Sequence, residues 1–222
     1  SLKQVTGKTG KKVAVIGSGP AGLSAAFYLL TAGHDCILFD KNMLAGGALR
    51  YEISDEKLPR EMLDSEIETI RMMGAEFRLN TCIDSAMFEN TIMPEYDAVI
   101  LATGNRSKQP VEVFGLEPNN LTNATDKKSL KTNRPGVFIC GNVIREQDMA
   151  VRAAAQGKMA AAEASAFLGS PAPRQPIGFN SAFGQLTAAE HAEYLKESVA
   201  GKAVVPEGGF TAGFNLSQAV AE

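Results

Sequence analysis

Three glycines at positions 17, 19 and 22 form the pattern in this chain that is best suited to chemistry. Gly17, Gly19 and Gly22 give the spacing G-x-G-x-x-G. In such a turn Gly17 permits a tight change of direction, Gly19 leaves room for a pyrophosphate at the backbone, and Gly22 lets a helix lie close to the preceding strand. Asp40 follows about twenty residues later and carries a carboxylate that can accept hydrogen bonds from a ribose diol. The residues therefore suit a dinucleotide.

The elements that must position these residues are a strand, a helix and a second strand. Apolar residues at 13–16 predict a short strand before the glycines, and residues 23–30 predict an apolar helix after them. A second apolar strand, 37–39, ends at Asp40. The glycines alone are a weak signal, but this order of elements predicts a dinucleotide site. An acidic residue at the end of the second strand favours FAD or NAD over NADP.

The rest of the chain predicts an α/β fold. We expect three layers around a mostly parallel sheet, with a small antiparallel excursion at 105–134. Residues 1–168 are expected to form one Rossmann-like domain. Residues 169–222 are expected to form an extended tail with a short helix at 187–199, which packs on the domain or on a partner. The further elements that the pattern predicts are a helix over 59–73, strands over 76–83 and 96–101, a short strand over 111–114, a strand over 137–140 and a helix over 148–168.

Composition narrows the functional classes. The net charge of the 222-residue chain is −3 and both signs are mixed along it, which argues against a nucleic-acid partner. No apolar run approaches the length of about eighteen residues that a membrane span needs. We expect a soluble, cytoplasmic protein.

Cysteine and histidine offer little further chemistry. The cysteines number three and form no C-x-x-C pair, which argues against a disulfide framework, a zinc site, an iron–sulfur cluster and a redox dithiol. We interpret Cys36, Cys82 and Cys140 as buried thiols. His34 and His191 have no catalytic partner by motif, and we expect both on the surface. The sequence predicts no metal site and no catalytic side chain.

Three further motifs follow the glycines in order: GGALRYEISDEKLPREML, YDAVILATG and RPGVFICGNVIREQDMAVRAAAQGKMAA. Together with the glycine turn they resemble the FAD-binding half of flavoproteins that have two dinucleotide-binding domains. The chain resembles the small (β) subunit of glutamate synthase and the flavin domain of dihydropyrimidine dehydrogenase. The resemblance covers residues 11–168 and implies that the cofactor is FAD.

The resemblance also implies which residues bind FAD. The glycine turn would hold the pyrophosphate. Asp40 and its neighbour Lys41 would hold the adenosine ribose. Ile83 would meet the adenine edge through its backbone, and Met149 would direct its N–H at the flavin pyrimidine carbonyl. The full set that the resemblance implies is Gly17, Ser18, Gly19, Pro20, Ala21, Gly22, Asp40, Lys41, Gly46, Gly47, Leu49, Ile83, Ala102, Thr103, Gly104, Gly141, Asn142, Asp148 and Met149.

The chain departs from the family pattern at two places. Asn142 stands where the family usually has Asp, so one charge at the ribityl chain is missing. The family also inserts a complete NAD(P)H-binding domain between the A-T-G turn and the last glycine motif. Gly104 and Gly141 are too close in this sequence for such a domain, and no second G-x-G-x-x-G occurs. The nicotinamide site is therefore expected to be supplied elsewhere or to have been lost.

These observations lead to two hypotheses of function. The first is an FAD-binding electron-transfer module of an oxidoreductase that resembles the glutamate synthase small subunit. The alternative is a non-catalytic flavin-binding structural or assembly subunit. A site for NAD instead of FAD is disfavoured, because a simple NAD domain has no need of Gly141, Asn142 and the helix after them. The partner we expect is an iron–sulfur or NAD(P)H-binding subunit or domain. The sequence leaves open whether the chain forms a homo-oligomer. No nucleic-acid or membrane partner is expected.

Overall fold

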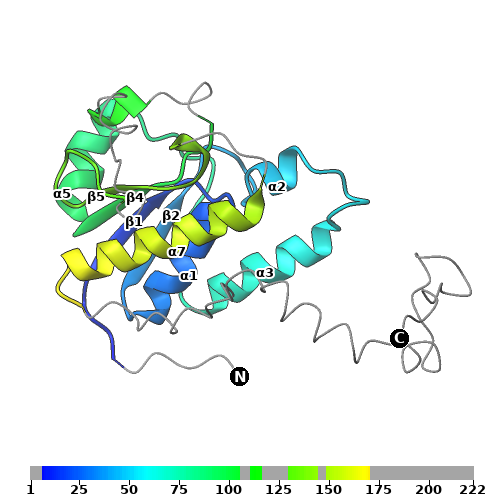
Figure 1. Cartoon of the computed structure of the whole chain (residues 1–222), viewed down its shortest axis with the longest axis horizontal. Coiled ribbons are helices and arrows are strands. Elements are labelled where there is room, and N and C mark those ends of the chain that lie inside the picture. The colour runs from blue at the N-terminus through cyan, green and yellow to red at the C-terminus, as the bar shows by residue number, and fades with distance from the viewer. Residues whose placement is uncertain (1–6, 106–110, 117–129, 145–148, 171–222) are drawn as a thin grey trace, which may run out of the picture. The chain divides into compact units, whose positions relative to one another are not determined.

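The chain folds around a five-stranded parallel sheet with the order β3-β2-β1-β4-β5 (Figure 1). The computed structural model describes residues 7–105, 111–116, 130–144 and 149–170. Every pair of neighbouring strands is parallel, which confirms the predicted Rossmann-like α/β fold. The strands are β1 (Lys12–Ile16), β2 (Asp35–Phe39), β3 (Glu76–Arg78), β4 (Ala98–Leu101) and β5 (Val137–Ile139).

Helices and short helical turns connect the strands. The two long helices predicted at 59–73 and 148–168 are present as α3 and α7. The helical elements are α1 (Pro20–Thr31), α2 (Ala48–Tyr51), α3 (Arg60–Met72), α4 (Ser85–Met87), the π-helical turn η1 (Phe88–Ile92), α5 (Met93–Glu95), the 3₁₀ turns η2 (Val111–Phe114) and η3 (Gly141–Val143), and α7 (Ala150–Phe167).

The strands bury side chains on both faces, and this defines three layers. Val13 and Val15 of β1 pack in a core with helices α1, α3 and α7. Ala14 and Ile16 point the opposite way and pack with Phe88 of η1 and its neighbours. Figure 1 shows α1, α3 and α7 along one face of the sheet. Strands covered on both faces read as continuous apolar runs, which is why the sequence predicted them.

Two predicted strands differ from the structure. The strand expected over 76–83 ends at Arg78, because the chain then turns at Asn80 (φ 52°) and the Thr81 N–H donates to the Asp40 carbonyl. The segment 111–114 is a 3₁₀ turn and not a strand. Its Phe114 is fully buried, and its ring packs edge-on against Phe88 at a centroid distance of 5.1 Å. A turn is enough to direct the Phe114 ring into the core, whereas a strand would direct alternate side chains to opposite faces.

The antiparallel excursion is reduced to an isolated bridge between Lys131 and Phe138 in the part of the chain that the structure describes. Asp148, His191 and the tail beyond residue 170 lie outside the described residues, so the domain boundary at 168/169 and the helix at 187–199 stay predictions. Among the described residues, no helix is both long enough and apolar enough to cross a membrane.

Helices α1 and α7 approach each other closely at Gly157. A Cβ atom on Gly157 would lie 2.1 Å from the Ala21 carbonyl oxygen and 3.0 Å from the Ala25 nitrogen, so only glycine fits. The Ser24 hydroxyl donates to the Ala154 carbonyl across the same interface at 2.7 Å. This contact sets the position of α7 relative to α1, and both helices begin at the end of the molecule where the glycine turn lies.

We expect Gly157→Ala to destabilise the protein by about 2 kcal/mol, because backbone overlap outweighs the better helix propensity of alanine. The free energy of unfolding from a urea titration measures this. Ala155→Ser, at an exposed position of the same helix, is the control and should change little. Equal stability of Gly157→Ala and the unchanged chain would contradict the close packing.

His34 is buried, with 2% of its surface exposed, so its predicted surface location is wrong. Its ring lies 2.7 Å from the Thr9 hydroxyl and 3.1 Å from the Ser165 hydroxyl, which places it between the N-terminal segment and α7. Burial lowers the pKa of His34, and the nearby Asp97 charge only partly opposes this. No local sequence signal marks the site, because Ser165 is distant in the chain.

The lowered pKa of His34 makes the unfolded state bind more protons than the folded state as the pH falls through about 6.5. Stability that is fully present above this pH should therefore decrease below it. The melting temperatures of the unchanged protein and of His34→Asn at pH 7.5 and 5.5 test this. The melting temperature of His34→Asn should fall less between the two pH values. An equal loss in both proteins would show that His34 does not cause the effect.

Candidate functional site

A groove with a volume of about 790 Å³ runs along the carboxyl ends of the strands. It lies where the strand order reverses, because the chain builds outward from β1 through β2 and β3 and then returns to add β4 and β5 on the other side. Open parallel sheets bind ligands at such a reversal point. The size is in the range of cofactor sites.

Most of the residues predicted from the resemblance line this groove. Ser18, Gly22 and Gly46 are absent from its lining, and Asp148 lies outside the described residues. The predicted residues in the lining are Gly17, Gly19, Pro20, Ala21, Asp40, Lys41, Gly47, Leu49, Ile83, Ala102, Thr103, Gly104, Gly141, Asn142 and Met149.

The β1–α1 turn is built by glycines with different steric demands. Gly17 has φ 107°, and a Cβ atom there would lie 2.2 Å from the Ala102 carbonyl oxygen. A Cβ atom on Gly22 would lie 1.9 Å from the Gly17 carbonyl oxygen. By contrast, a Cβ atom on Gly19 would have the Gly47 Cα, at 3.8 Å, as its nearest neighbour. Gly17 and Gly22 are thus required by the fold, whereas Gly19 leaves space open toward the groove.

The first turn of α1 presents free donors to the groove. Leu23 makes the first helical hydrogen bond, to the Gly19 carbonyl at 2.9 Å. Pro20 has no N–H, and the N–H groups of Ala21 and Gly22 have no partner among the described residues. The first turn carries no acidic side chain. Free N–H groups and the positive end of the helix dipole together favour an anion.

Asp40 lies at the groove but is already bonded within the chain. One carboxylate oxygen accepts from the Ser18 N–H at 2.8 Å and the Ser18 hydroxyl at 2.5 Å, and the other accepts from the backbone and side-chain amides of Asn42 at 2.9 and 3.0 Å. A carboxylate has about four acceptor positions. A ribose diol must therefore replace one of these donors, and the Ser18 hydroxyl can rotate away.

Ser18 was predicted to hold the pyrophosphate, and the structure places it differently. Its side chain is fully buried, and both of its donors bind Asp40. Ser18 therefore orients the acid from beneath the groove. Asn42, two residues after Asp40, completes the arrangement and was missed because nothing in its local sequence marks it.

Thr103 supplies an unpaired polar atom at the groove. Its Oγ1 is buried, and among the described residues it is the buried side-chain nitrogen or oxygen atom that lacks a hydrogen-bond partner. Such a group in a folded protein needs an explanation, and a bound ligand is one. Thr103 lies in the A-T-G turn directly after β4 and lines the groove. A ligand in the groove that offers a polar atom would satisfy the Thr103 hydroxyl.

The β5–η3 turn contributes Gly141 and Asn142. Gly141 has φ 82°, and its N–H donates to the Gln156 Oε1 of α7 at 2.8 Å. The Gly141 N–H is therefore engaged with the chain, whereas Asn142 lines the groove. Gln156 fixes this turn on α7, and a sequence pattern could not identify it because the pair spans two elements.

The start of α7 reaches the same groove from the other side. Met149 is the N-cap, and its carbonyl accepts from the N–H groups of Arg152 and Ala153. The N–H groups of Ala150 and Val151 have no partner among the described residues. Met149, Ala150 and Ala153 line the groove. Two helix N-termini, those of α1 and α7, therefore converge on one groove and favour negative charge in it.

The lining also holds residues that the sequence did not reveal. Tyr51 ends helix α2 and Ile53 lies in the loop after it, and both are exposed. Exposed apolar residues in a loop are a signal that could have marked them. Cys82 lines the groove and is exposed, so its predicted burial is wrong. The remaining missed residues are Ile16, Phe39, Asn42, Ala48, Glu52, Thr81, Asn105, Ala150 and Ala153.

The cysteines do not form a redox pair. All three are free thiols, and burial raises the pKa of Cys36 and Cys140. A raised pKa keeps a thiol protonated and unreactive. In the part of the chain that the structure describes, no group of His, Cys, Asp or Glu is arranged to hold a metal ion.

Comparison with known proteins agrees with this site. The chain is 41% identical over 107 residues to the NADP(+)-dependent formate dehydrogenase subunit beta of Moorella thermoacetica, and 36% identical over 125 residues to the glutamate synthase [NADPH] small chain of Bacillus subtilis. It is 38% identical over 113 residues to the NAD-dependent dihydropyrimidine dehydrogenase subunit PreT homolog of Salmonella typhi. These matches cover 48%, 56% and 51% of this chain and 15%, 25% and 27% of the relatives.

Solved structures add little. FprA of Mycobacterium tuberculosis, an oxidoreductase, is 21% identical with a TM-score of 0.40 over 44% of this chain and 23% of that chain. A likeness of this size carries no argument.

The family assignment comes from the sequence profile of pyridine nucleotide-disulphide oxidoreductases, which matches residues 11–129, more than half of the chain. The matched segment contains the glycine turn, Asp40 and the A-T-G turn. Members of this family bind FAD. The chain therefore belongs to the pyridine nucleotide-disulphide oxidoreductase family and is a partial FAD-binding module of it.

Proposed function

We propose that this chain binds FAD without a covalent bond in the groove and serves as the electron-transfer module of a larger oxidoreductase. The observation that carries the proposal is the convergence of two helix N-termini on a groove whose lining includes Thr103, the residue with the buried and unpaired Oγ1. The curated relatives named above are parts of oxidoreductases by their names, and this chain spans 15–27% of their lengths.

Different residues along the groove would bind different parts of the cofactor. The N–H groups of Ala21 and Gly22 would hold the diphosphate. Gly19 has no side chain, so the diphosphate could approach the backbone there. Asp40, oriented by Ser18, would bind the adenosine ribose once the Ser18 hydroxyl turns away. The order of these residues along the groove matches a dinucleotide laid across the sheet edge.

The flavin end would lie against η3 and α7. Asn142 would hydrogen-bond the ribityl chain; it lacks the charge of an aspartate, and a charge-assisted bond is worth roughly 1 kcal/mol more. The free N–H groups at the start of α7 would face the flavin ring and stabilise negative charge on it. Bound FAD would supply the hydride or electron transfer, since the described residues offer position and electrostatics and no side-chain chemistry.

The nicotinamide site is proposed to lie on another domain or subunit. A complete NAD(P)H domain cannot fit between Gly104 and Gly141, where the described residues hold one 3₁₀ turn and strand β5. An iron–sulfur or NAD(P)H-binding partner would then complete the electron path. A cytoplasmic location is also proposed, supported by three unpaired cysteines, which suit a reducing compartment.

Gly19→Ala tests the placement of the diphosphate. The new methyl group fits the protein because its nearest neighbour is 3.8 Å away, but it would stand in the path of the phosphates. We expect FAD affinity, measured by quenching of flavin fluorescence, to fall at least about 100-fold. The melting temperature of the apoprotein should stay within about 2 °C.

Gly104→Ser, at another lining glycine, is unsuitable as a control because Gly104 has φ 79°. Lys57→Gln, on an exposed loop outside the groove lining, should keep full FAD affinity and serves instead. Unchanged FAD affinity in Gly19→Ala, or no FAD binding by the unchanged chain, would contradict the proposal.

A second candidate function, a flavin-binding structural or assembly subunit, is favoured by the short span between Gly104 and Gly141. The two candidates differ in whether the flavin exchanges electrons with a partner. We expect anaerobic NADPH to leave the visible absorption of the FAD-loaded chain unchanged, because the nicotinamide site is proposed to lie on another domain or subunit. Rapid bleaching by NADPH would show that the site is present after all. Dithionite reduction, which needs no nicotinamide site, is the control.

A further inference from the structure

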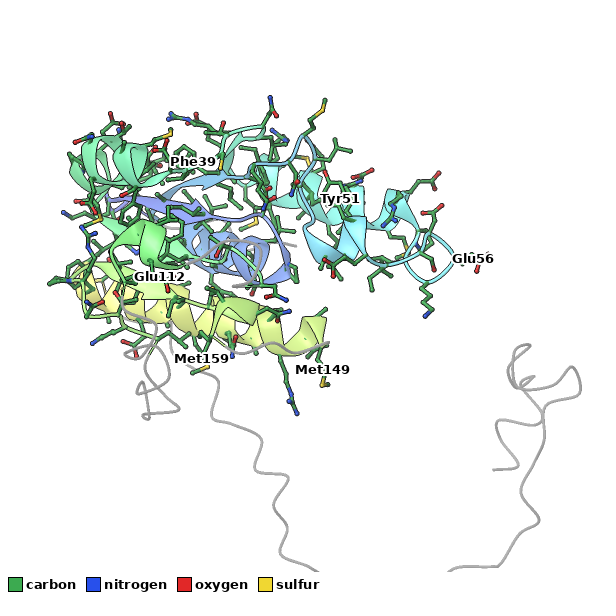
Figure 2. All side chains as sticks on the ribbon, turned by 90° about the horizontal axis from the view of Figure 1, so that it is seen from above. Phe39, Tyr51, Glu56, Glu112, Met149 and Met159 are labelled. Atoms are coloured by element: carbon green, nitrogen blue, oxygen red, sulfur yellow. The ribbon has the colours of Figure 1, made fainter. Side chains whose placement is uncertain are left out.

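One wall of the groove is a long excursion that has almost no core of its own. This segment, residues 41–58, is called the arm here and leads from β2 through α2 to α3. Gly47, Leu49, Tyr51 and Ile53 of the arm line the groove. Within the arm only Ala45 and Gly46 are buried. Figure 2 shows Tyr51 on the arm, Glu56 at its far end, and Met149 of α7 at the same end of the molecule.

Apolar packing holds the arm only weakly. Leu49 and Leu58 pack against the core and are partly buried. Met43, Leu44 and Tyr51 are more than half exposed. The helix α2 has four residues and no buried side chain, so it cannot be stable by itself. The position of the arm must therefore depend on specific polar contacts.

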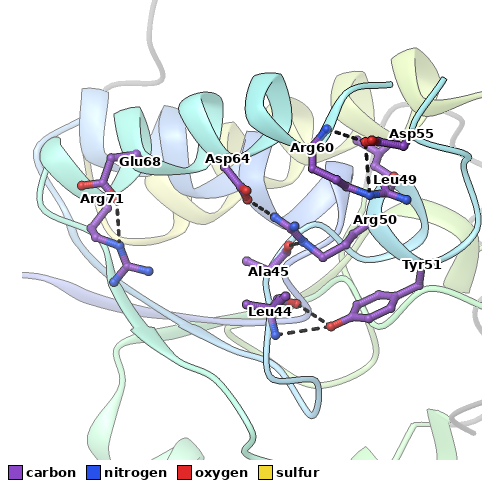
Figure 3. A network of polar contacts seen from close by, with 10 residues as sticks. All are labelled: Leu44, Ala45, Leu49, Arg50, Tyr51, Asp55, Arg60, Asp64, Glu68 and Arg71. Carbon is purple, nitrogen blue, oxygen red and sulfur yellow. Dashed lines mark hydrogen bonds and ion pairs between the residues drawn. The ribbon is translucent and has the colours of Figure 1, made fainter. Parts of the chain in front are cut away.

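Arg60, the first residue of α3, supplies two of these contacts. Its Nη1 donates to the Leu49 carbonyl at 2.9 Å (Figure 3). Its Nη2 donates to the Ile53 carbonyl at 2.7 Å. Leu49 lies in α2, where the last carbonyls have no partner within the helix. Arg60 therefore joins the end of α2 and the chain beyond it to α3. The backbone N–H of Arg60 also bonds to the arm, because it donates to the Asp55 carboxylate at 2.8 Å.

Arg50 fastens the base of the arm. Its Nε donates to the Ala45 carbonyl at 2.5 Å, and its guanidinium forms an ion pair with Asp64, one turn beyond Arg60 on α3. The Arg50 side chain is 10% exposed. The closed segment between Ala45 and Arg50 contains Gly47, where a Cβ atom would lie 2.7 Å from the Gly19 Cα. The base of the arm therefore rests directly on the phosphate-binding turn.

We propose that Arg50 and Arg60 are positioning residues of the cofactor groove: they hold the arm on α3 so that Gly47, Leu49 and Tyr51 form its wall. Neither arginine lines the groove, so both act through the backbone that they bind. This inference rests on the proposed function, since it takes FAD as the ligand of the groove. It extends that function to the residues that control how tightly the cofactor is retained.

The geometry requires arginine and not merely a positive charge. Arg60 reaches two carbonyls that are four residues apart, and a planar guanidinium offers separate donors for both. A lysine ammonium at position 60 could satisfy one carbonyl well and would leave the other without its partner. Lysine should therefore restore part, but not all, of the function.

The test compares Arg60→Gln, Arg60→Lys and Arg50→Gln in the full 222-residue chain. Arg71→Gln is the matched control, because Arg71 lies on the same helix, pairs with Glu68 at 3.4 Å and stacks over Phe77 away from the arm. Three quantities are measured: the FAD dissociation constant, the melting temperature of the apoprotein, and the rate at which a glutamate-specific protease cleaves the apoprotein after Glu52 and Glu56. The substitutions leave both cleavage sites intact.

We expect Arg60→Gln to raise the FAD dissociation constant by about tenfold or more, since charge-assisted hydrogen bonds to the wall are lost. Cleavage of the arm should accelerate by about tenfold, because its local opening becomes easier while the sheet stays folded. Arg50→Gln should behave similarly, Arg60→Lys should lie between Arg60→Gln and the unchanged chain, and Arg71→Gln should match the unchanged chain.

Equal FAD affinity and equal cleavage in Arg60→Gln and the unchanged chain would overturn the inference. So would a fall of more than about 5 °C in the apoprotein melting temperature, or failure to fold, because the arginine would then hold the whole domain. Failure of the unchanged chain to bind FAD is a different result. It would overturn the proposed function, while the cleavage rates would still show whether the arginines hold the arm.

Discussion

Close backbone contact at the carboxyl ends of β1 and β4 is the constraint on which the structure depends. Gly17, Gly22 and Gly157 each lie so near a main-chain oxygen that a methyl group would overlap it. These contacts press α1 onto the sheet and α7 onto α1. The two helices must then begin beside the strand ends. The position of the groove is therefore a consequence of how tightly the backbone packs.

The same packing creates the electrostatic character of the groove. Pro20 and Ala21 at the start of α1 and Met149 and Ala150 at the start of α7 line the same groove, and neither first turn carries an acidic side chain. The acid at the groove, Asp40, is restrained by Ser18 and Asn42. An anionic diphosphate at one end and a reduced flavin at the other suit this arrangement. The chain itself contributes orientation and partial charge.

The functional residues rest on supports that lie beneath or beside them. Ser18 orients Asp40, Gln156 fixes Gly141, and Arg50 and Arg60 hold the arm. Each support bonds a backbone group or carboxylate that the cofactor side of the groove depends on.

Local patterns in the sequence predicted the features that depend on residues close together in the chain. The strands are continuous apolar runs because both faces of the sheet are buried, and the glycine turn is visible because its residues are adjacent. Contacts between distant segments were not predictable. His34 is buried because Ser165 and Thr9 meet it, Phe114 turns inward because Phe88 receives it, and Cys82 is exposed because the chain leaves β3 early at Arg78. Each of these outcomes depends on a partner elsewhere in the fold.

Backbone amide shifts during an FAD titration of the ¹⁵N-labelled chain test the central claim most directly. We expect FAD to change the amide chemical shifts of Gly19, Ala21 and Gly22 at the start of α1 and of Ala150 at the start of α7. A second hollow, about 450 Å³ in volume and lined in part by Lys12, Glu76 and Tyr96, lies at the amino ends of the strands. Shifts confined to that hollow, or no shifts at all, would contradict the account.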